Sequence, residues 1–218
     1  MIQIDDAGSG SLVGGTLIGL LRVETFEFYY DIIPIEYFTT PFFENKLYLN
    51  YCTIIINEGL KYLKPDKNEK IEICQGYIFE KARAYLKQNS YNFYPTKIEE
   101  PLQSKIEDTF VKYAISLGIP ENYLSYTKYP FHFHKLLRWV FADYETRKSL
   151  CKTGWKSWNK YKDVPLKRYT DYIESSNFQC LKCGKKINAP CKIKVIKFTT
   201  NKDYFIYLHL NCSSSQCK

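Results

Sequence analysis

The sequence predicts an α/β fold: a mixed five-stranded sheet flanked by helices, followed by a small cysteine-rich unit. Three observations predict it. Stretches rich in β-branched and aromatic residues follow one another closely in the first 38 residues, which indicates an antiparallel meander. Helical and strand-like segments then alternate up to residue 117. Five of the eight cysteines lie in the last 39 residues of this 218-residue chain, so one buried domain with a small appendix is expected.

The first three strands are expected at residues 1–5, 12–23 and 25–38. The first is a short apolar run, the second is aliphatic and punctuated by glycine, and the third contains the aromatic sequence TFEFYYDIIPIEYF. Because only a few residues separate them, they are expected to pair with their neighbours along the chain. Residues 45–63 place apolar side chains at helical spacing and predict the first helix.

Alternating strands and helices follow the lysine-rich stretch KPDKNEK. Residues 71–76 and 91–98 are β-rich and predict the fourth and fifth strands. A short helix is expected at residues 80–88, and a stripe of apolar residues predicts an amphipathic helix at 101–117. Residues 132–150 predict one more helix. Connections between the parallel strands are expected to cross over in the right-handed sense.

The formal net charge of +8 is distributed unevenly. Residues 1–134 carry 13 basic and 17 acidic side chains, residues 135–169 carry ten and three, and residues 170–218 carry eight and three. A basic C-terminal third joined to a mildly acidic body indicates a polyanionic partner such as nucleic acid. The alternative is a solvated lysine-rich surface that binds nothing.

The sequence favours a cytoplasmic protein without a membrane partner. No apolar run reaches the roughly 18 residues that a membrane-spanning helix needs. Asp5 and Asp6 occupy the place where a secretory signal peptide would carry basic residues. The paired cysteine spacings suit a metal ion better than a framework of disulfides.

The opening stretch IDDAGSGSLVGG combines two adjacent acids with closely spaced glycines. It resembles the D-E-x-G-R-G-x-L-x-G signature on the first strand of type 2 ribonucleases H, and the order of elements resembles the ribonuclease H-like superfamily. The positions in register are Asp5, Asp6, Ala7, Gly8, Gly10, Leu12 and Gly14. Asp6 stands where the signature has Glu, and Ser9 stands where it has Arg.

The resemblance implies a nuclease that hydrolyses phosphodiester bonds with two divalent cations, Mg²⁺ or Mn²⁺. Asp5 would be the central metal ligand and Asp6 the second, because such ions prefer carboxylate oxygens. Gly8, Ser9 and Gly10 would approach a nucleic-acid backbone closely, although the absent Arg weakens the expectation that they read an RNA–DNA junction. The alternative is a strand end followed by an ordinary Gly/Ser turn.

The other acids of the resembled site have no clear counterparts. Where the superfamily has an acid at the end of the fourth strand, this chain has Cys74, Gln75 and Gly76. The helix expected at residues 132–150 offers His134 and Asp143, and some Holliday-junction resolvases of the superfamily use a histidine in that helix. Both residues are candidate catalytic groups, and the alternative is that they are ordinary surface or packing residues.

The C-terminal cysteines have the spacing of a zinc site. Cys180 and Cys183 form a CxxC pair, His209 and Cys212 form an HxxC pair, and a β-hairpin is expected between the pairs. The segment resembles a treble-clef or zinc-ribbon finger, and three thiolates with one imidazole suit a structural, tetrahedral Zn²⁺. Either of the two other cysteines in this segment, at positions 191 and 217, could replace His209.

A basic and aromatic bridge joins the two parts. Its lysines would contact phosphates and its aromatic rings would stack on bases. The residues predicted to contact nucleic acid are Lys152, Trp155, Lys156, Trp158 and Lys160. The alternative is that the tryptophans dock the bridge onto the core while the lysines stay solvated.

The sequence therefore predicts a ribonuclease H-like domain at residues 1–150, the bridge at 151–170 and a zinc-finger-like domain at 171–218. The predicted function is a metal-dependent nuclease that acts on an RNA/DNA hybrid, a duplex or a junction. One alternative is a non-catalytic nucleic-acid-binding adaptor with a degenerate site. Another is a phosphotransferase related to the actin-like ATPases, for which the chain has room for only one of the two domains required.

Overall fold

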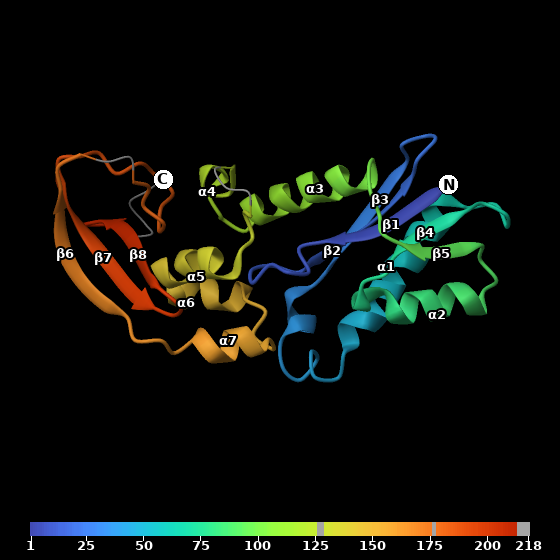
Figure 1. Ribbon diagram of the computed structural model, residues 1–218, viewed down its shortest axis with the longest axis horizontal. Coiled ribbons are helices and arrows are strands. Elements are labelled where there is room, and N and C mark those ends of the chain that lie inside the picture. The colour runs from blue at the N-terminus through green and yellow to red at the C-terminus, as the bar shows by residue number, and fades with distance from the viewer. Residues whose placement is uncertain (126–128, 176–177, 213–218) are drawn as a thin grey trace.

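The computed structural model describes residues 1–125, 129–175 and 178–212. Two sheets lie at opposite ends of the elongated molecule, and helices lie between them, among them α5 (Phe133–Ala142), α6 (Tyr144–Arg147) and α7 (Lys156–Tyr161) (Figure 1). No helix among the described residues is long and apolar enough to cross a membrane.

The larger sheet is the mixed five-stranded sheet that the sequence predicts. Its order is β3-β2-β1-β4-β5, with β1, β2 and β3 antiparallel and β1, β4 and β5 parallel. β1 is therefore the central strand, and the ends of β1 and β4 lie side by side. The strands are β1 (Ile2–Ala7), β2 (Thr16–Arg22), β3 (Phe28–Ile33), β4 (Ile71–Cys74) and β5 (Phe93–Thr96).

Helices cover both faces of this sheet, because alternate side chains of β1 point to opposite sides. Ile2 and Ile4 are buried against α1 (Leu47–Leu63) and α2 (Glu80–Gln88), whereas Ala7 is buried against α3 (Leu102–Ser116). The short helix α4 follows at Glu121–Ser125. Single turns of 3₁₀ helix occur at Ile35–Phe38, Tyr77–Phe79 and Lys148–Leu150.

The smaller sheet has three antiparallel strands in the order β6-β7-β8. They are β6 (Lys167–Ile173), β7 (Cys191–Thr199) and β8 (Asp203–His209). β7 and β8 form the predicted hairpin. β6 gives no apolar alternation in the sequence because it is an edge strand whose first six side chains are exposed, and it spans the expected boundary at residue 170.

The single helix expected at residues 132–150 is wrong. Asp143 has φ −153° and ψ 64°, which is not helical, so α5 ends at Ala142 and α6 starts in a new direction. The break has a physical reason, because it lets the buried Arg147 guanidinium donate hydrogen bonds to the carbonyls of Trp139 and Leu181, at 2.6 and 2.8 Å.

One apolar core joins the central helices to the smaller sheet. Phe141 of α5 packs edge-to-face on Phe198 of β7, with ring centroids 5.1 Å apart. The same core reaches the loop after β1, where Val13 forms a β-bridge with Cys151 and the Lys152 amide donates to the Leu12 carbonyl at 2.9 Å. The segment before α7 thus holds the glycine-rich loop in place.

Candidate active site and metal centre

The two adjacent acids lie at the C-terminal end of the central strand. The register of β1 and β4 pairs Ile4 with Ile73, which brings Asp5 beside Cys74. One oxygen of each carboxylate, of Asp5 and of Asp6, and the Cys74 Sγ all lie within 4.8 Å of one another. Three groups that can bind a metal ion therefore converge at the ends of two parallel strands.

The acids are held in an environment that disfavours their negative charges. Burial, together with the nearby carboxylates of Asp6 and Glu107, raises the pKa of Asp5 to about 6, against hydrogen bonds from Cys74 and the Asp6 backbone. Burial also raises the pKa of Asp6, while hydrogen bonds from Ser9 and the charge of Lys152 lower it. Crowded, partly desolvated carboxylates of this kind are stabilised by a bound cation.

Cys74 is a site residue that the sequence reasoning identified only as a missing acid. Burial raises the pKa of its thiol to about 11, and the charges of Asp5 and Asp6 act in the same direction, opposed by the Gly76 amide. That amide donates to Sγ at 3.4 Å. The signal was present in the sequence as a cysteine at the end of a buried strand.

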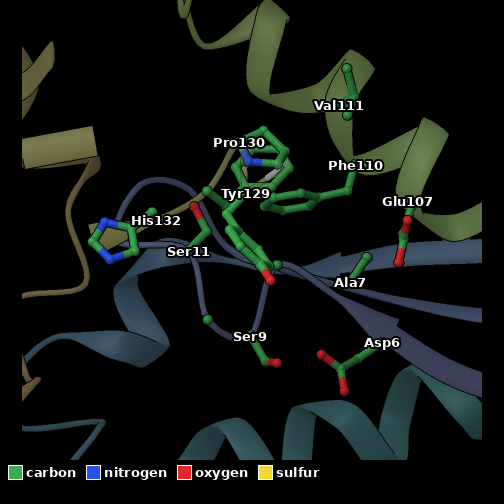
Figure 2. Close-up of a pocket in the computed structure, with 13 residues that line it drawn as sticks. Asp6, Ala7, Ser9, Ser11, Glu107, Phe110, Val111, Tyr129, Pro130 and His132 are labelled. Atoms are coloured by element: carbon green, nitrogen blue, oxygen red, sulfur yellow. The ribbon is translucent and has the colours of Figure 1, made fainter. Parts of the chain in front are cut away.

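Glu107 is a second residue that the sequence reasoning missed. It lies on α3, the helix that packs directly on β1 and β2, and its carboxylate raises the pKa of Asp5. Figure 2 shows Asp6 and Glu107 on opposite sides of β1, and the charges of both raise the pKa of Asp5. The sequence predicts a further acid in residues 132–150, whereas α3 is the helix that packs on β1 and β2.

His134 and Asp143 are not part of the group formed by Asp5, Asp6 and Cys74. The Asp143 carboxylate lies 3.4 Å from Lys182 Nζ, so it pairs with the CxxC loop. The His134 ring stacks on Tyr204 at 5.1 Å, and its buried Nε2 has no hydrogen-bond partner among the described residues. Both belong to the junction between the central helices and the smaller sheet, where α5 packs on β8.

The glycine-rich loop forms one wall of a cleft of about 490 Å³. Asp6, Ser9 and Gly10 line it together with Glu107 and residues 129–132 (Figure 2). Gly8 has φ +81°, and a Cβ there would lie 2.1 Å from the Phe110 ring, so no other residue fits. Gly10 has open space around it, which leaves the backbone accessible to a ligand.

Lys152 supports the loop from inside, and its expected contact with nucleic acid is wrong. The side chain is fully buried, and Nζ donates to the Gly8 carbonyl at 2.7 Å and to Thr16 Oγ1 at 2.9 Å. Burial lowers its pKa to about 7, against the charge of Asp6. Its Nζ also lies over the rings of Phe38 and Trp155. The lysine therefore stabilises the loop from the interior of the protein.

The bridge divides into docked and exposed residues. Trp158 is buried in the shared core, so its expected contact with nucleic acid is also wrong, and Trp155 is half-buried over Lys152. Lys156 and Lys160 are exposed on α7. The rings thus dock the bridge, and of the five residues predicted to contact nucleic acid only Lys156 and Lys160 are exposed.

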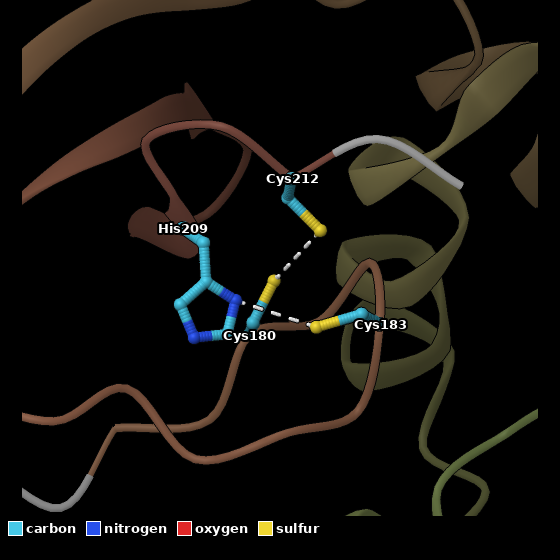
Figure 3. Close-up of side chains that lie close together, drawn as sticks. All are labelled: Cys180, Cys183, His209 and Cys212. Atoms are coloured by element: carbon cyan, nitrogen blue, oxygen red, sulfur yellow. Dashed lines mark hydrogen bonds between the residues drawn. The ribbon is translucent and has the colours of Figure 1, made fainter. Parts of the chain in front are cut away.

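Cys180, Cys183, His209 and Cys212 form a second group whose ligand atoms lie within 4.8 Å of one another (Figure 3). Cys180 Sγ is 3.7 Å from Cys212 Sγ, and Cys183 Sγ is 3.3 Å from His209 Nδ1. Burial and the neighbouring thiols raise the pKa of Cys212, a crowding that a cation relieves. This Cys₃His group could bind zinc as a closed tetrahedral site.

Neighbouring groups orient this second cluster. The Lys186 carbonyl lies 3.1 Å from His209 Nε2, which directs Nδ1 toward the thiols. Arg147 donates to the carbonyls of Leu181 and Lys182 within the CxxC loop, both at 2.8 Å. Cys191 is not part of the group. The expectation that Cys217 could replace a ligand lies outside the described residues.

No protein-family model matches the sequence, and no curated protein matches it. The structure therefore defines the class of protein by itself. It is an α/β protein with a mixed five-stranded sheet, a separate three-stranded sheet and a Cys₃His group.

Proposed function

We propose that the protein is a divalent-metal-dependent nuclease with a ribonuclease H-like fold. The observation that carries the proposal is the convergence of Asp5, Asp6 and Cys74 at the ends of β1 and β4. The strand order β3-β2-β1-β4-β5 is compatible with that fold. The acids correspond to the metal ligands of the resembled superfamily, and Asp6 lines a cleft next to a glycine-rich loop.

The residues in and around the cleft would have different roles in phosphodiester hydrolysis. A divalent cation held here would polarise the phosphate and the attacking water. Asp5 and Asp6 would be the carboxylate ligands, and Glu107, whose charge raises the pKa of Asp5, would lie on the other side of β1 from Asp6. The exposed backbone at Gly10 would approach the sugar–phosphate chain, while Lys152 fixes the loop beneath it.

Positive charge near the cleft supports a nucleic-acid substrate. His132 lines the cleft. Burial lowers the pKa of His134, and the nearby charges of His132, Lys202 and Lys160 act in the same direction. Lys160 is exposed on α7, and Lys202 is exposed between β7 and β8. A structured nucleic acid or an RNA/DNA hybrid that enters the cleft would extend over them.

A cleavage panel tests the proposal. Full-length wild type, Asp5→Asn and Asp31→Asn are incubated with hybrid, double-stranded, single-stranded and junction substrates in Mg²⁺, Mn²⁺ or Co²⁺. Asp31 is the matched control because it is an exposed acid on β3 of the same sheet. Wild type and Asp31→Asn are expected to cleave, and Asp5→Asn is expected to lose at least about a hundredfold in rate, as for loss of a metal ligand. Equal cleavage by all three would contradict the proposal.

A non-catalytic adaptor is the second candidate, because Cys74 occupies the position at which the resembled superfamily carries an acid. In that case wild type and Asp5→Asn would bind the same substrates with equal affinity, and neither would cleave them in any metal. Gel-shift and cleavage measurements on the same preparations separate the two functions.

A further inference from the structure

We propose that the site at the ends of β1 and β4 selects a borderline-soft transition-metal ion, of the class of Co²⁺, Fe²⁺ and Zn²⁺, in preference to Mg²⁺, with Cys74 as a ligand. The proposal rests on the proposed function, whose metal ion it specifies. It departs from the Mg²⁺ or Mn²⁺ that the resemblance implies, because the donor set of this chain is not made of oxygen alone.

The geometry brings the thiol into the carboxylate pair. Cys74 is the last residue of β4 and follows Ile73, which is paired with Ile4 of β1. Its Sγ hydrogen-bonds to Asp5 and lies within 4.8 Å of oxygens of both acids. Cys74 is only half-buried, so an ion that reaches the acids also reaches the sulfur.

The surroundings of Cys74 Sγ differ from those of a cysteine that is packed in the core. Cys151 is fully buried and donates to the Arg147 carbonyl at 3.5 Å. Cys74 Sγ instead accepts from the Gly76 amide and donates to a carboxylate. The Gly76 amide stabilises a Cys74 thiolate. The hydrogen bond from Cys74 to Asp5 is lost when a cation binds to the sulfur and the carboxylate.

The chemistry of the donors decides the metal. Mg²⁺ takes oxygen ligands in near-ideal octahedral geometry, whereas thiolates favour softer divalent ions such as Co²⁺ and Zn²⁺. On binding, the S–H bond breaks, a metal–sulfur bond forms, and the proton leaves to buffer. Two carboxylates and one thiolate then supply three negative charges to a divalent ion, with no change in oxidation state.

Cobalt titration of the full-length protein tests the proposal. The chain is first loaded with one equivalent of Zn²⁺ to fill the Cys₃His group, and Co²⁺ is then added while near-ultraviolet absorption from sulfur-to-cobalt charge transfer is followed. Wild type is expected to bind one further ion with such a band. Cys74→Ser is expected to lose the band and at least about tenfold in Co²⁺ affinity, and Cys191→Ser, a half-buried cysteine outside both groups, is expected to behave as wild type.

A second variant keeps the test independent of cobalt. Cys74→Asp restores an all-oxygen donor set, so its affinity for Mg²⁺ is expected to rise at least tenfold over wild type, while its Co²⁺ band is lost. Co²⁺ binding by wild type without a band, and equally by Cys74→Ser, would overturn the role of Cys74 and leave the proposed nuclease intact. If wild type binds neither Co²⁺, Mn²⁺ nor Mg²⁺ beyond the first zinc, both proposals are overturned.

Discussion

The two groups of metal-binding side chains are built in opposite ways. The Cys₃His group takes its ligands from two short segments that each carry a pair, so a hairpin is enough to bring the pairs together. The carboxylate group takes Asp5 and Asp6 from β1 and Cys74 from β4, about seventy residues away. The Cys₃His group can be recognised from the spacing of its residues in the sequence. The carboxylate group forms only when β1 and β4 pair in the observed register.

The difference also separates structural from reactive chemistry. The Cys₃His group offers four ligands and is enclosed by the CxxC loop and its Arg147 contacts. The carboxylate group offers three ligands, and one of them, Asp6, lines a cleft. A closed tetrahedral site stabilises a fold, and a site with free positions can bind substrate.

Removing one thiolate from the Cys₃His group is expected to have the largest effect. Cys183→Ala should abolish binding of the stoichiometric Zn²⁺ and lower the free energy of unfolding by at least about 3 kcal/mol, because metal binding and folding are coupled in such small units. Metal analysis by mass spectrometry and calorimetric unfolding check this. Cys191→Ser is the matched control, and retention of zinc by Cys183→Ala would contradict the assignment.

The Cys₃His group could be predicted because CxxC and HxxC pairs bring their side chains together by local geometry, whatever the rest of the chain does. The larger sheet could also be predicted, since hydrophobic period and propensity are local signals. β6 could not, because an edge strand with solvent on its exposed side chains needs no apolar alternation.

Loss of the buried guanidinium is expected to have the next largest effect. Arg147→Met leaves the carbonyls of Trp139, Leu181 and Lys182 without their donor, at a cost of about 2–4 kcal/mol. Urea unfolding measures the cost. Lys148→Ala removes a neighbouring charge that pairs with Glu145 at the surface, and it should change stability by less than about 0.5 kcal/mol. If the two variants changed the free energy of unfolding equally, the buried hydrogen bonds of Arg147 would add no stability beyond that of a surface ion pair.

Lys152 gives a prediction that depends on pH. Its pKa is lowered to about 7 in the folded protein, while the unfolded lysine keeps its proton to about pH 10.4. Between these values the unfolded state binds more protons, so the stability of the wild type should rise with pH, by at most about 1.4 kcal/mol per unit. Lys152→Met should lack this rise and lose about 1–3 kcal/mol at pH 7, because the Gly8 carbonyl and Thr16 hydroxyl lose a donor.

Urea unfolding at pH 7 and pH 9 measures that difference. Lys156→Met is the control, because Lys156 lies four residues further along and is exposed. Its stability should follow the wild type at both pH values. A wild-type pH dependence that survives in Lys152→Met would assign the rise to another group.

The acids around the cleft mark the limit of prediction from sequence. The motif at residues 5–14 identified Asp5 and Asp6, but their partners depend on which helix packs on β1. The sequence predicts helices at residues 101–117 and 132–150. The resemblance to the ribonuclease H-like superfamily favours the second of them as the source of a further acid. In the structure α3 packs on β1, whereas α5 packs on β8, so Glu107 replaces His134 and Asp143 as the acid beside Asp5.

Glu107→Gln tests that replacement. It should lower affinity for the divalent ion at the carboxylate group by about tenfold, as loss of a charged partner near a metal ligand does. It should also lower the pKa of Asp5, because the Glu107 charge raises it. Metal titration and carboxyl NMR measure the two effects. Asp108→Asn, the next residue on the same helix, is exposed and should change neither, so equal effects would point to net charge alone.

The smallest expected effect concerns the exposed face of α7. Lys160→Ala should weaken binding of nucleic acid by about two- to threefold and reduce the slope of log Kd against log salt by about one, as for one lost phosphate contact. Lys87→Ala on α2 is the control, because Lys87 is equally exposed but belongs to the larger sheet's helical layer. Binding measured at several salt concentrations distinguishes them. If both variants lower the slope equally, the lysines contribute only a general positive field. If only Lys160→Ala does, the bound nucleic acid contacts α7, the helix that follows Lys152.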